Sequence, residues 1–406
     1  MNWKDVIPLT LPENTLSSLS ENPIQHQAEN VTPTQTSSNP YTFADSDLMA
    51  SPSLIFYKDL IELNTTRIIG MAGSPDRLWP HVKTHKSADL VALQKRMGIN
   101  RFKCATIAEA EMLATCQVAD VLLAYPLVGP NIVRFVQLQR AFPEVRFWAI
   151  GDDLGQLIQL GQESAANQIT TRVLLDVNPG MNRTGVPMEM AQSCYDDAAR
   201  VQGIEMAGIH CYDGHRHEAD YAVRYRKCQE TAQFVLQLKR SLEAQKIPCE
   251  TLVMGGSPSF PCYIEHPEIF LSPGTIFIHD YGYVIHYPDL PFVPAAVILS
   301  RVISCTGPGQ FTLDLGSKGI AADPVGLRGQ IVGLEHAEPL FQSEEHWAWQ
   351  MVEGHESACP SVGDCFFVIP THICPTSALY AEAVVVEKGQ LSGTWPITAR
   401  NRRLTY

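Results

Sequence analysis

Two lysines and two histidines are crowded into one short segment of the chain, Pro80–Ser87. Lys83 lies between His81 and His85. A lysine amine that is withdrawn from water has a lowered pKa, and the neutral amine is a nucleophile that forms Schiff bases with carbonyl groups. Position alone fits two other interpretations equally well: a lysine in an ordinary ion pair, or one beside two histidine ligands of a metal-dependent hydrolase.

Two side chains that can bind a metal ion lie near the end of the chain. His372 and Cys374 are two residues apart, so on an extended segment both side chains fall on one face and can hold one ion. Imidazole and thiolate favour zinc, with manganese as the second choice of divalent metal. Two protein ligands leave positions open for water or substrate, as a catalytic site requires. An isolated pair of this kind is more often a coincidence.

The glycine-rich run Gly255-Gly256-Ser257 follows a predicted strand. Successive backbone N–H groups in such a loop, together with a hydroxyl, form a concave site for an anion such as a phosphate. The same tripeptide marks many ordinary turns, so by itself it predicts only a turn.

The elements that must position these residues alternate along the chain. Short β-branched or aromatic runs are separated by segments with helical spacing, among them Ile107–Cys116 and Tyr221–Glu243. Thr106 and Glu109 form a capping-box pattern that places a helix start directly after a strand. The eight predicted strands are 81–83, 101–105, 121–125, 146–150, 172–177, 207–212, 251–255 and 275–278. This count predicts a (β/α)₈ TIM barrel with Lys83 at the carboxyl end of the first strand.

The pattern changes on both sides of the barrel. Residues 1–45 are rich in Ser, Thr, Asn, Gln and Pro, which predicts a flexible extension. Residues 46–290 form the predicted barrel domain, and residues 291–406 read as an all-β domain that carries the metal pair. The early strand 53–57 is expected to pair with the β-domain rather than with the barrel.

Composition excludes several classes of protein. A formal charge of −13 over 406 residues disfavours nucleic acid and anionic membranes as partners. The eleven cysteines are spread singly and no secretory signal precedes the polar start of the chain, which predicts reduced thiols in a cytoplasmic protein. No apolar stretch approaches the roughly 20 residues that span a bilayer.

The segment Pro80-His81-Val82-Lys83-Thr84-His85-Lys86-Ser87 resembles the cofactor-lysine motif of the D-threonine aldolase and D-serine dehydratase group. These are fold-type III pyridoxal-phosphate enzymes related to alanine racemase, and the resemblance continues in order from about residue 50 to 390. It implies an alanine racemase-like barrel with a C-terminal β-domain and pyridoxal 5′-phosphate bound to Lys83, beside His81. The chain departs from the family in carrying Trp79 where an arginine is usual.

The resemblance also implies roles for residues further along. Arg183 is expected at the phenolic oxygen of the cofactor, Tyr212 against its ring, and His215 or His217 as an acid or base facing the substrate. The expected phosphate contacts are Gly255, Gly256, Ser257, Gly274 and Thr275. Within the resemblance, His372 and Cys374 become the metal ligands rather than a coincidence.

These assignments imply a lyase for small D-3-hydroxy amino acids that works as a homodimer. Dehydratases of this group carry His-x-Cys at the metal, whereas the aldolases carry His-x-Asp, so Cys374 favours dehydration to a 2-oxo acid and ammonia. Retro-aldol cleavage to glycine and an aldehyde is the alternative. A racemase would need no metal, and a non-catalytic cofactor-binding barrel would lack the β-domain.

Overall fold

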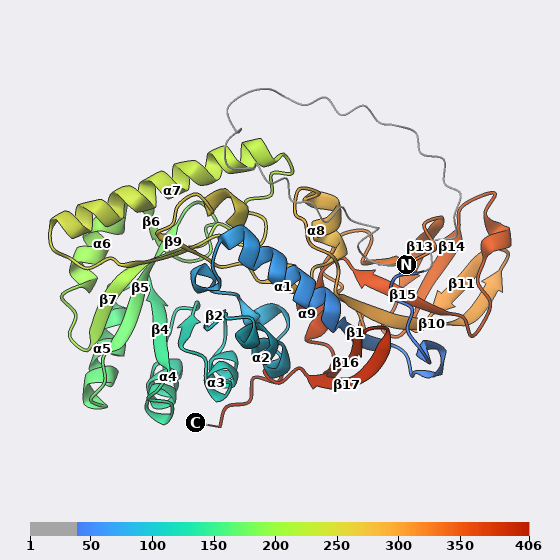
Figure 1. The fold of residues 1–406 in the computed structure, drawn as a ribbon, viewed down its shortest axis with the longest axis horizontal. Coiled ribbons are helices and arrows are strands. Elements are labelled where there is room, and N and C mark those ends of the chain that lie inside the picture. Colours follow the sequence, from blue (N-terminus) through green and yellow to red (C-terminus); the bar gives the residue numbers. More distant parts are fainter. Residues whose placement is uncertain (1–38, 406) are drawn as a thin grey trace.

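The computed structural model describes residues 39–405, and most of the predicted N-terminal extension lies outside this range. The described molecule has two parts, a barrel with its helices and a β-sheet domain at its side (Figure 1). The last residues of the predicted extension pack on the β-sheet domain. Tyr41 and Phe43 are buried there, and the Tyr41 hydroxyl donates to the Pro294 carbonyl over 3.0 Å. The end of the predicted extension, at Tyr41 and Phe43, is therefore docked on the body of the molecule.

One parallel sheet forms the barrel, in the order β2-β3-β4-β5-β7-β8-β9, with the short β6 added beside β5. Its strands are β2 (Arg101–Cys104), β3 (Asp120–Leu123), β4 (Arg146–Gly151), β5 (Thr171–Asn178), β6 (Val186–Pro187), β7 (Ile204–Cys211), β8 (Thr251–Met254) and β9 (Ile269–Leu271). The irregular segment 78–81 lies between β9 and β2, where Leu78 bridges to Leu271 and His81 to Lys103. This segment closes the sheet, so the predicted TIM-barrel architecture is confirmed.

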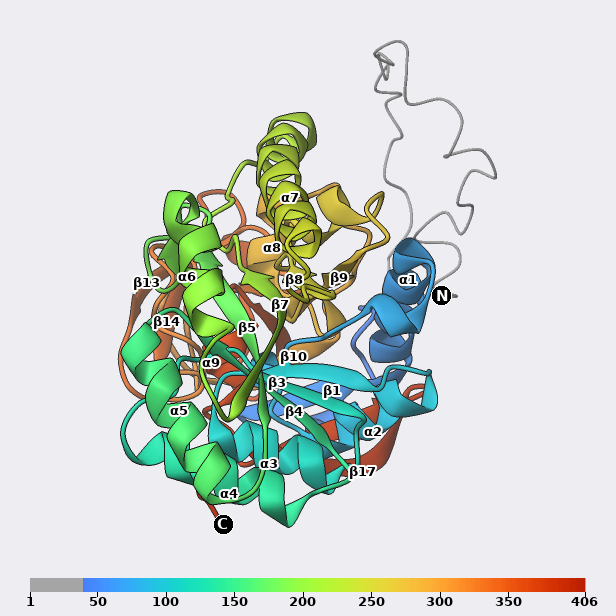
Figure 2. The same ribbon diagram turned by 90° about the vertical axis from the view of Figure 1, so that its left-hand side faces the viewer.

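Helices lie on the outside of the strands (Figure 2). They are α1 (Lys58–Ala72), α2 (Ala88–Arg96), α3 (Ile107–Thr115), α4 (Pro130–Ala141), α5 (Leu154–Ala166), α6 (Ala191–Ala198) and α7 (Tyr221–Ala244). The predicted N-cap of α3 is present, because Thr106 Oγ accepts the N–H of Glu109 over 3.1 Å. The Glu109 carboxylate does not return to Thr106; it accepts the N–H of Ala105 instead, over 2.7 Å.

Two predicted barrel strands were wrong. Residues Val82–Thr84 form a 3₁₀ turn, because the His81 ring accepts the N–H of Lys83 over 3.3 Å and caps the turn. Residues Thr275–Phe277 also form a 3₁₀ turn, and the last strand is β9 instead. Both turns follow a proline within two residues, Pro80 and Pro273, which cannot donate to a sheet ladder.

The inside of the barrel is packed rather than hollow. A cluster of apolar side chains fills it, with Trp79 edge-on to Trp148 at a ring distance of 5.7 Å. The tryptophan that replaces the usual arginine therefore forms part of the core. Polar residues are buried in the same strands, Lys103 on β2, Asp176 on β5 and His210 on β7.

The second part is a nine-stranded sheet with β1 (Ser53–Tyr57) between β10 and β16. The remaining strands are β10 (Ala296–Gly307), β11 (Gln310–Leu313), β12 (Gly329–Ile331), β13 (Ala337–Gln342), β14 (Trp347–Met351), β15 (Cys365–Pro370), β16 (Glu382–Glu387) and β17 (Gln390–Pro396). All its pairings are antiparallel except β1 with β16. The short helices α8 (Tyr281–His286) and α9 (Ile373–Ser377) lie between the two parts (Figure 1).

Candidate active site

Lys83 lies where segment 78–81 ends, on the 3₁₀ turn at the mouth of the barrel. Burial lowers the pKa of its amine, and the nearby Arg183 guanidinium acts in the same direction. Burial also lowers the pKa of His81 well below its ordinary value, so this imidazole is neutral at pH 7. A neutral His81 can accept the backbone N–H of Lys83, and this bond fixes the residue that carries the amine.

Three basic side chains surround the ring of Tyr212, which follows β7. The nitrogens of Lys83 and Lys103 lie 5.7 and 5.0 Å from the ring centre, and the guanidinium carbon of Arg183 lies 5.3 Å from it. An aromatic face attracts cations at such distances. Burial raises the pKa of Tyr212 to about 12, so the ring stays a neutral phenol. The structure thus brings together the predicted residues Lys83, Arg183 and Tyr212.

Glycines make room for that ring. A Cβ added at Gly214 would lie 2.4 Å from the Tyr212 ring, and one added at Gly256 would lie 3.1 Å from it. Gly255 has a positive φ of 77°, which favours glycine, and its Cβ would meet the backbone of Phe260 at 3.0 Å. The loop after β8 therefore needs both of its glycines to approach Tyr212 and the following turn.

The two predicted phosphate loops are in contact. Ser257 Oγ accepts the N–H groups of Gly274 and Thr275 over 3.3 and 3.1 Å. A Cβ at Gly274 would lie only 3.0 Å from the His81 carbonyl oxygen. The loops thus converge on the segment that carries Lys83, and their backbone N–H groups and hydroxyls, the groups that bind a phosphate in such loops, lie close together there. This arrangement fits the phosphate of pyridoxal 5′-phosphate.

A buried, hydrogen-bonded pair that the sequence did not predict lies beneath the mouth. Asp176 Oδ1 is 2.7 Å from His210 Nδ1, on neighbouring strands and in register. Asp176 Oδ2 and His210 Nε2 are buried with no hydrogen-bond partner among the described residues. Both side chains line a small cavity with Arg183 and Tyr212. Unsatisfied buried polar atoms beside a cavity indicate a polar group that binds there.

Lys103 is the other residue that sequence reasoning missed. It is 2% exposed, and burial, together with the charge of Lys83, lowers its pKa to about 7. Its position in β2 could have predicted this burial. Side chains alternate along a strand, and the neighbours Phe102 and Cys104 belong to the outer core, so Lys103 points into the barrel.

The metal pair lies at the boundary of the two parts of the molecule. Cys374 Sγ is 3.3 Å from Thr84 Oγ1 and 3.4 Å from Thr275 Oγ1, and His372 Nδ1 is 2.5 Å from Asp323 Oδ2. Burial opposes ionisation of the thiol, but the hydrogen bond from His372 outweighs it and lowers the pKa of Cys374. Burial also opposes the imidazolium, yet Cys374 and Asp323 raise the pKa of His372 to about 9.

A cysteine sulfur beside a histidine nitrogen fits a zinc ion in donor type, since metal binding displaces the protons of both ligands. Within residues 39–405, no cluster of three or more His, Cys, Asp or Glu side chains is arranged to hold a metal ion. A metal with His372 and Cys374 as its two protein ligands would keep other positions open, as in the expected catalytic site.

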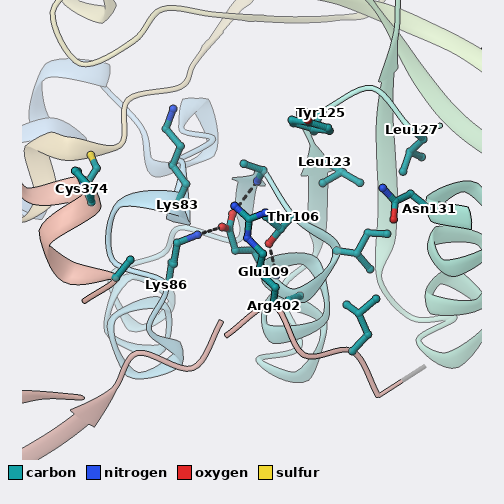
Figure 3. Close-up of a pocket in the computed structure, with 16 residues that line it drawn as sticks. Lys83, Lys86, Thr106, Glu109, Leu123, Tyr125, Leu127, Asn131, Cys374 and Arg402 are labelled. Carbon is teal, nitrogen blue, oxygen red and sulfur yellow. Dashed lines mark hydrogen bonds and ion pairs between the residues drawn. The ribbon is translucent and has the colours of Figure 1, made fainter. Parts of the chain in front are cut away.

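A cavity of about 560 Å³ opens beside Lys83 (Figure 3). Lys83 and Cys374 lie on one side of it, and residues of α3 and the loop after β3 lie on the other. The amine from the barrel and the thiol from the β-domain thus face one space. His215 and His217 are outside the wall of this cavity: Nε2 of His215 points toward Gly180, and His217 Nδ1 is 3.4 Å from the Tyr287 hydroxyl.

The barrel with a lysine at its mouth and a β-domain beside it is the architecture of the alanine racemase-like enzymes. The sequence model described as "Alanine racemase, N-terminal domain" matches residues 58–280, more than half of the chain. The chain therefore belongs to this family, the fold-type III pyridoxal-phosphate enzymes. A second model, "Putative serine dehydratase domain", matches residues 295–386.

Within this family, the chain is similar to D-threonine aldolases and to a related dehydratase. The chain is 25% identical to a D-threonine aldolase of an Arthrobacter species over 359 residues, which cover 86% of this chain and 92% of the relative. It superposes on the crystal structure of D-threonine aldolase from Filomicrobium marinum with a TM-score of 0.81 and 27% identity, covering 88% and 98% of the two chains. D-threo-3-hydroxyaspartate dehydratase from a Delftia species shares the fold, with a TM-score of 0.77, 19% identity and coverage of 86% and 98%.

The predicted resemblance to the D-threonine aldolase and D-serine dehydratase group is thereby confirmed, and the chain is an enzyme of the lyase type. Within the described residues, no helix is both long and apolar enough to cross a membrane.

Proposed function

We propose that this enzyme is a pyridoxal-phosphate- and divalent-metal-dependent lyase that converts a D-3-hydroxy amino acid into a 2-oxo acid and ammonia. The observation that carries the proposal is the shared cavity of Lys83 and Cys374. It offers an amine suited to covalent cofactor binding and a thiol suited to metal binding on one wall. A β-hydroxy amino acid has a group for each of them, the amino group and the hydroxyl.

In this proposal the cofactor is held by residues from five segments. Lys83 provides the covalent link, with His81 beside it, Tyr212 packs on the ring, and Arg183 faces the phenolic oxygen. The phosphate is held by Gly255, Gly256, Ser257, Gly274 and Thr275. When bound, the cofactor withdraws electrons from the α-carbon of the substrate. The unsatisfied Asp176 and His210 are buried near Arg183, and they support a polar group bound at this point.

The residues of the chain then have two tasks. They remove the α-proton of the substrate, and they hold the hydroxyl group that leaves. Lys83 lines the cavity, and burial lowers the pKa of its amine, which favours the neutral form that can take the α-proton. His215 and His217 stay predicted as alternative acid or base residues. The geometry favours Lys83 for the α-proton, because neither histidine lines the cavity.

His372 and Cys374 are proposed as ligands of zinc, with manganese as the second choice, where the metal would act as a Lewis acid on the substrate hydroxyl. Solved structures of a D-threo-3-hydroxyaspartate dehydratase support this. Two of these structures are variants that replace a histidine and a cysteine two positions apart, and the cysteine variant is in the metal-free form. His372 and Cys374 have the same spacing.

The test is a product analysis. Purified protein with pyridoxal phosphate and zinc is offered D-serine, D-threonine and D-3-hydroxyaspartate, with the L-enantiomers as controls. A 2-oxo acid with an equal amount of ammonia, from D-substrates alone, supports the proposal. If the products are glycine and an aldehyde, the enzyme is an aldolase and not a dehydratase. If no D-substrate is turned over, the proposed function is refuted.

We also propose that the enzyme works as a homodimer in the cytoplasm. Tyr125 and Val128, each 58% exposed, lie in the loop after β3, and Tyr125 lines the cavity beside Lys83. Large apolar side chains at an active-site mouth favour cover by a second copy. Light scattering on the purified protein gives its mass in solution; a single monomer mass at micromolar concentration contradicts the dimer.

A further inference from the structure

The end of the chain returns from the β-domain to the barrel. After β17, the Ala399 N–H donates to the Lys86 carbonyl over 3.1 Å, and the Thr405 N–H donates to the Glu111 carboxylate over 3.1 Å. Leu404 packs against the barrel core between these two anchors. The segment 399–405, which we name the C-terminal strap, is thus fixed on the barrel at both ends, below α3 in Figure 1.

Arg402 of the strap lines the cavity that contains Lys83 and Cys374 (Figure 3). Its φ is +54°, and Lys86 in the same wall has a φ of +51°. A positive φ is uncommon for residues with side chains and persists where surrounding contacts impose it. The anchored strap therefore imposes a backbone conformation that brings the Arg402 side chain to the cavity.

The charges on the cavity wall leave Arg402 without a counterion. Lys86 is paired with the fully buried carboxylate of Glu109, and Lys83 is assigned to the cofactor. Arg402 has no hydrogen-bond or ion-pair partner within residues 39–405. It is therefore the unpaired cation of the wall, and a guanidinium binds a carboxylate through two parallel hydrogen bonds.

We propose that Arg402 determines substrate specificity by binding a second carboxylate, on the side chain of the substrate. The preferred substrate is then a D-3-hydroxy amino acid with a carboxylate on its β-carbon, that is, a 3-hydroxyaspartate. This inference rests on the proposed function, because the amino group and the hydroxyl are taken to lie at Lys83 and Cys374. Figure 3 shows Arg402 next to α3, on the wall of the same cavity that Lys83 and Cys374 line.

The test compares two arginines of the strap. Arg403 lines a different groove, with Ala88 and Thr115, so Arg403→Met is the matched control. For Arg402→Met, the ratio of kcat/KM for D-3-hydroxyaspartate to kcat/KM for D-serine is expected to fall by about 10- to 100-fold, mainly through KM, as the loss of a charge-assisted hydrogen bond predicts. Arg403→Met is expected to keep the ratio of the wild type.

If Arg402→Met lowers kcat/KM equally for both substrates, the inference is overturned, because Arg402 would then bind the α-carboxylate or stabilise the fold. An unchanged ratio in Arg402→Met overturns it as well. A binding measurement distinguishes failure of the carboxylate site at Arg402 from failure of the proposed function. Calorimetry with D-aspartate and D-alanine, which lack the hydroxyl, is expected to show that Arg402→Met weakens D-aspartate binding by about 10-fold or more relative to D-alanine binding. Absence of turnover with that binding difference intact refutes the lyase and leaves the carboxylate site standing.

Discussion

The sulfur of Cys374 lies 3.3 Å from Oγ1 of Thr84, the residue that follows Lys83. Ser377 reinforces this contact, because its hydroxyl donates to the Thr84 carbonyl. A cysteine of the β-domain is therefore held against the barrel segment that carries the reactive lysine. Any movement of the β-domain on the barrel would change the position of the thiol relative to the amine, so this contact sets the geometry of the proposed reaction.

Replacing that sulfur tests the metal assignment. We expect Cys374→Ala to reduce bound zinc, measured by elemental analysis of the dialysed protein, and to lower kcat/KM by about 100-fold or more, since even outer contacts of a metal site contribute 10- to 100-fold. Pyridoxal phosphate content should be retained. Cys305→Ala, at an exposed cysteine, is the control. Zinc content that is equal in both variants contradicts the assignment.

The close approach at Gly274 gives a test of the phosphate loops. A methyl group there meets the His81 carbonyl at 3.0 Å and Thr84 Oγ1 at 3.3 Å, so Gly274→Ala must displace the segment that carries Lys83. Overpacking of this kind costs about 1–3 kcal/mol, and we expect the dissociation constant of pyridoxal phosphate to rise by about 10-fold or more.

Gly70→Ala is the matched control for that substitution. Gly70 lies in α1, and a Cβ there has no heavy atom within 4 Å. Because alanine favours helix over glycine, the control should be at least as stable as the wild type and bind the cofactor normally. If both alanine variants bind the cofactor like the wild type, the loops do not hold the phosphate.

Lys103 predicts a pH dependence of stability. Burial lowers its pKa from 10.5 to about 7 in the folded protein. Between these values the unfolded chain binds more protons than the folded one, so this lysine makes stability rise with pH, by at most about 1.4 kcal/mol per unit. We expect the free energy of unfolding of the wild type, minus that of Lys103→Met, to increase from pH 7 to pH 9 in urea titrations. Lys318→Met, at an exposed lysine, is the control.

The pair Lys86–Glu109 predicts a coupling energy. The Glu109 side chain is fully buried and that of Lys86 is 15% exposed, so removing one partner leaves the other charge without its counterion. We expect Glu109→Gln to cost about 1–3 kcal/mol of stability, and Lys86→Met to cost at least as much. The double variant should lose less free energy of unfolding than the two single variants lose together. Additive losses in a double-mutant cycle would show that the pair contributes no coupling.

Sequence patterns predicted the architecture because they reflect local physics. The alternation of apolar runs gave six of the barrel strands, β2, β3, β4, β5, β7 and β8, and Thr106 marked the start of α3. The turns at 82–84 and 275–277 were mistaken for strands, because a short apolar run looks the same in both. What distinguishes them is the donors that His81 and Ser257 bind, and these contacts exist only after folding.

The candidate site was predictable only in part, for a related reason. Motifs identified Lys83, Arg183, Tyr212 and the two loops, which the structure brings together. The partnership of Asp176 with His210 depends on the register between β5 and β7, and the exposure of Arg402 to the cavity depends on how the strap crosses the barrel. Neither register nor chain crossing is encoded within a single segment.

The role of Lys83 as the residue that carries the cofactor can be tested by locating the covalent link. The protein is loaded with pyridoxal phosphate and reduced with borohydride, which makes the link to the lysine amine permanent, and its peptides are then mapped by mass spectrometry. We expect the added mass of the reduced cofactor on the peptide that contains Lys83, and its loss in Lys83→Met. The same mass on Lys103, on Lys86 or on no peptide would contradict it.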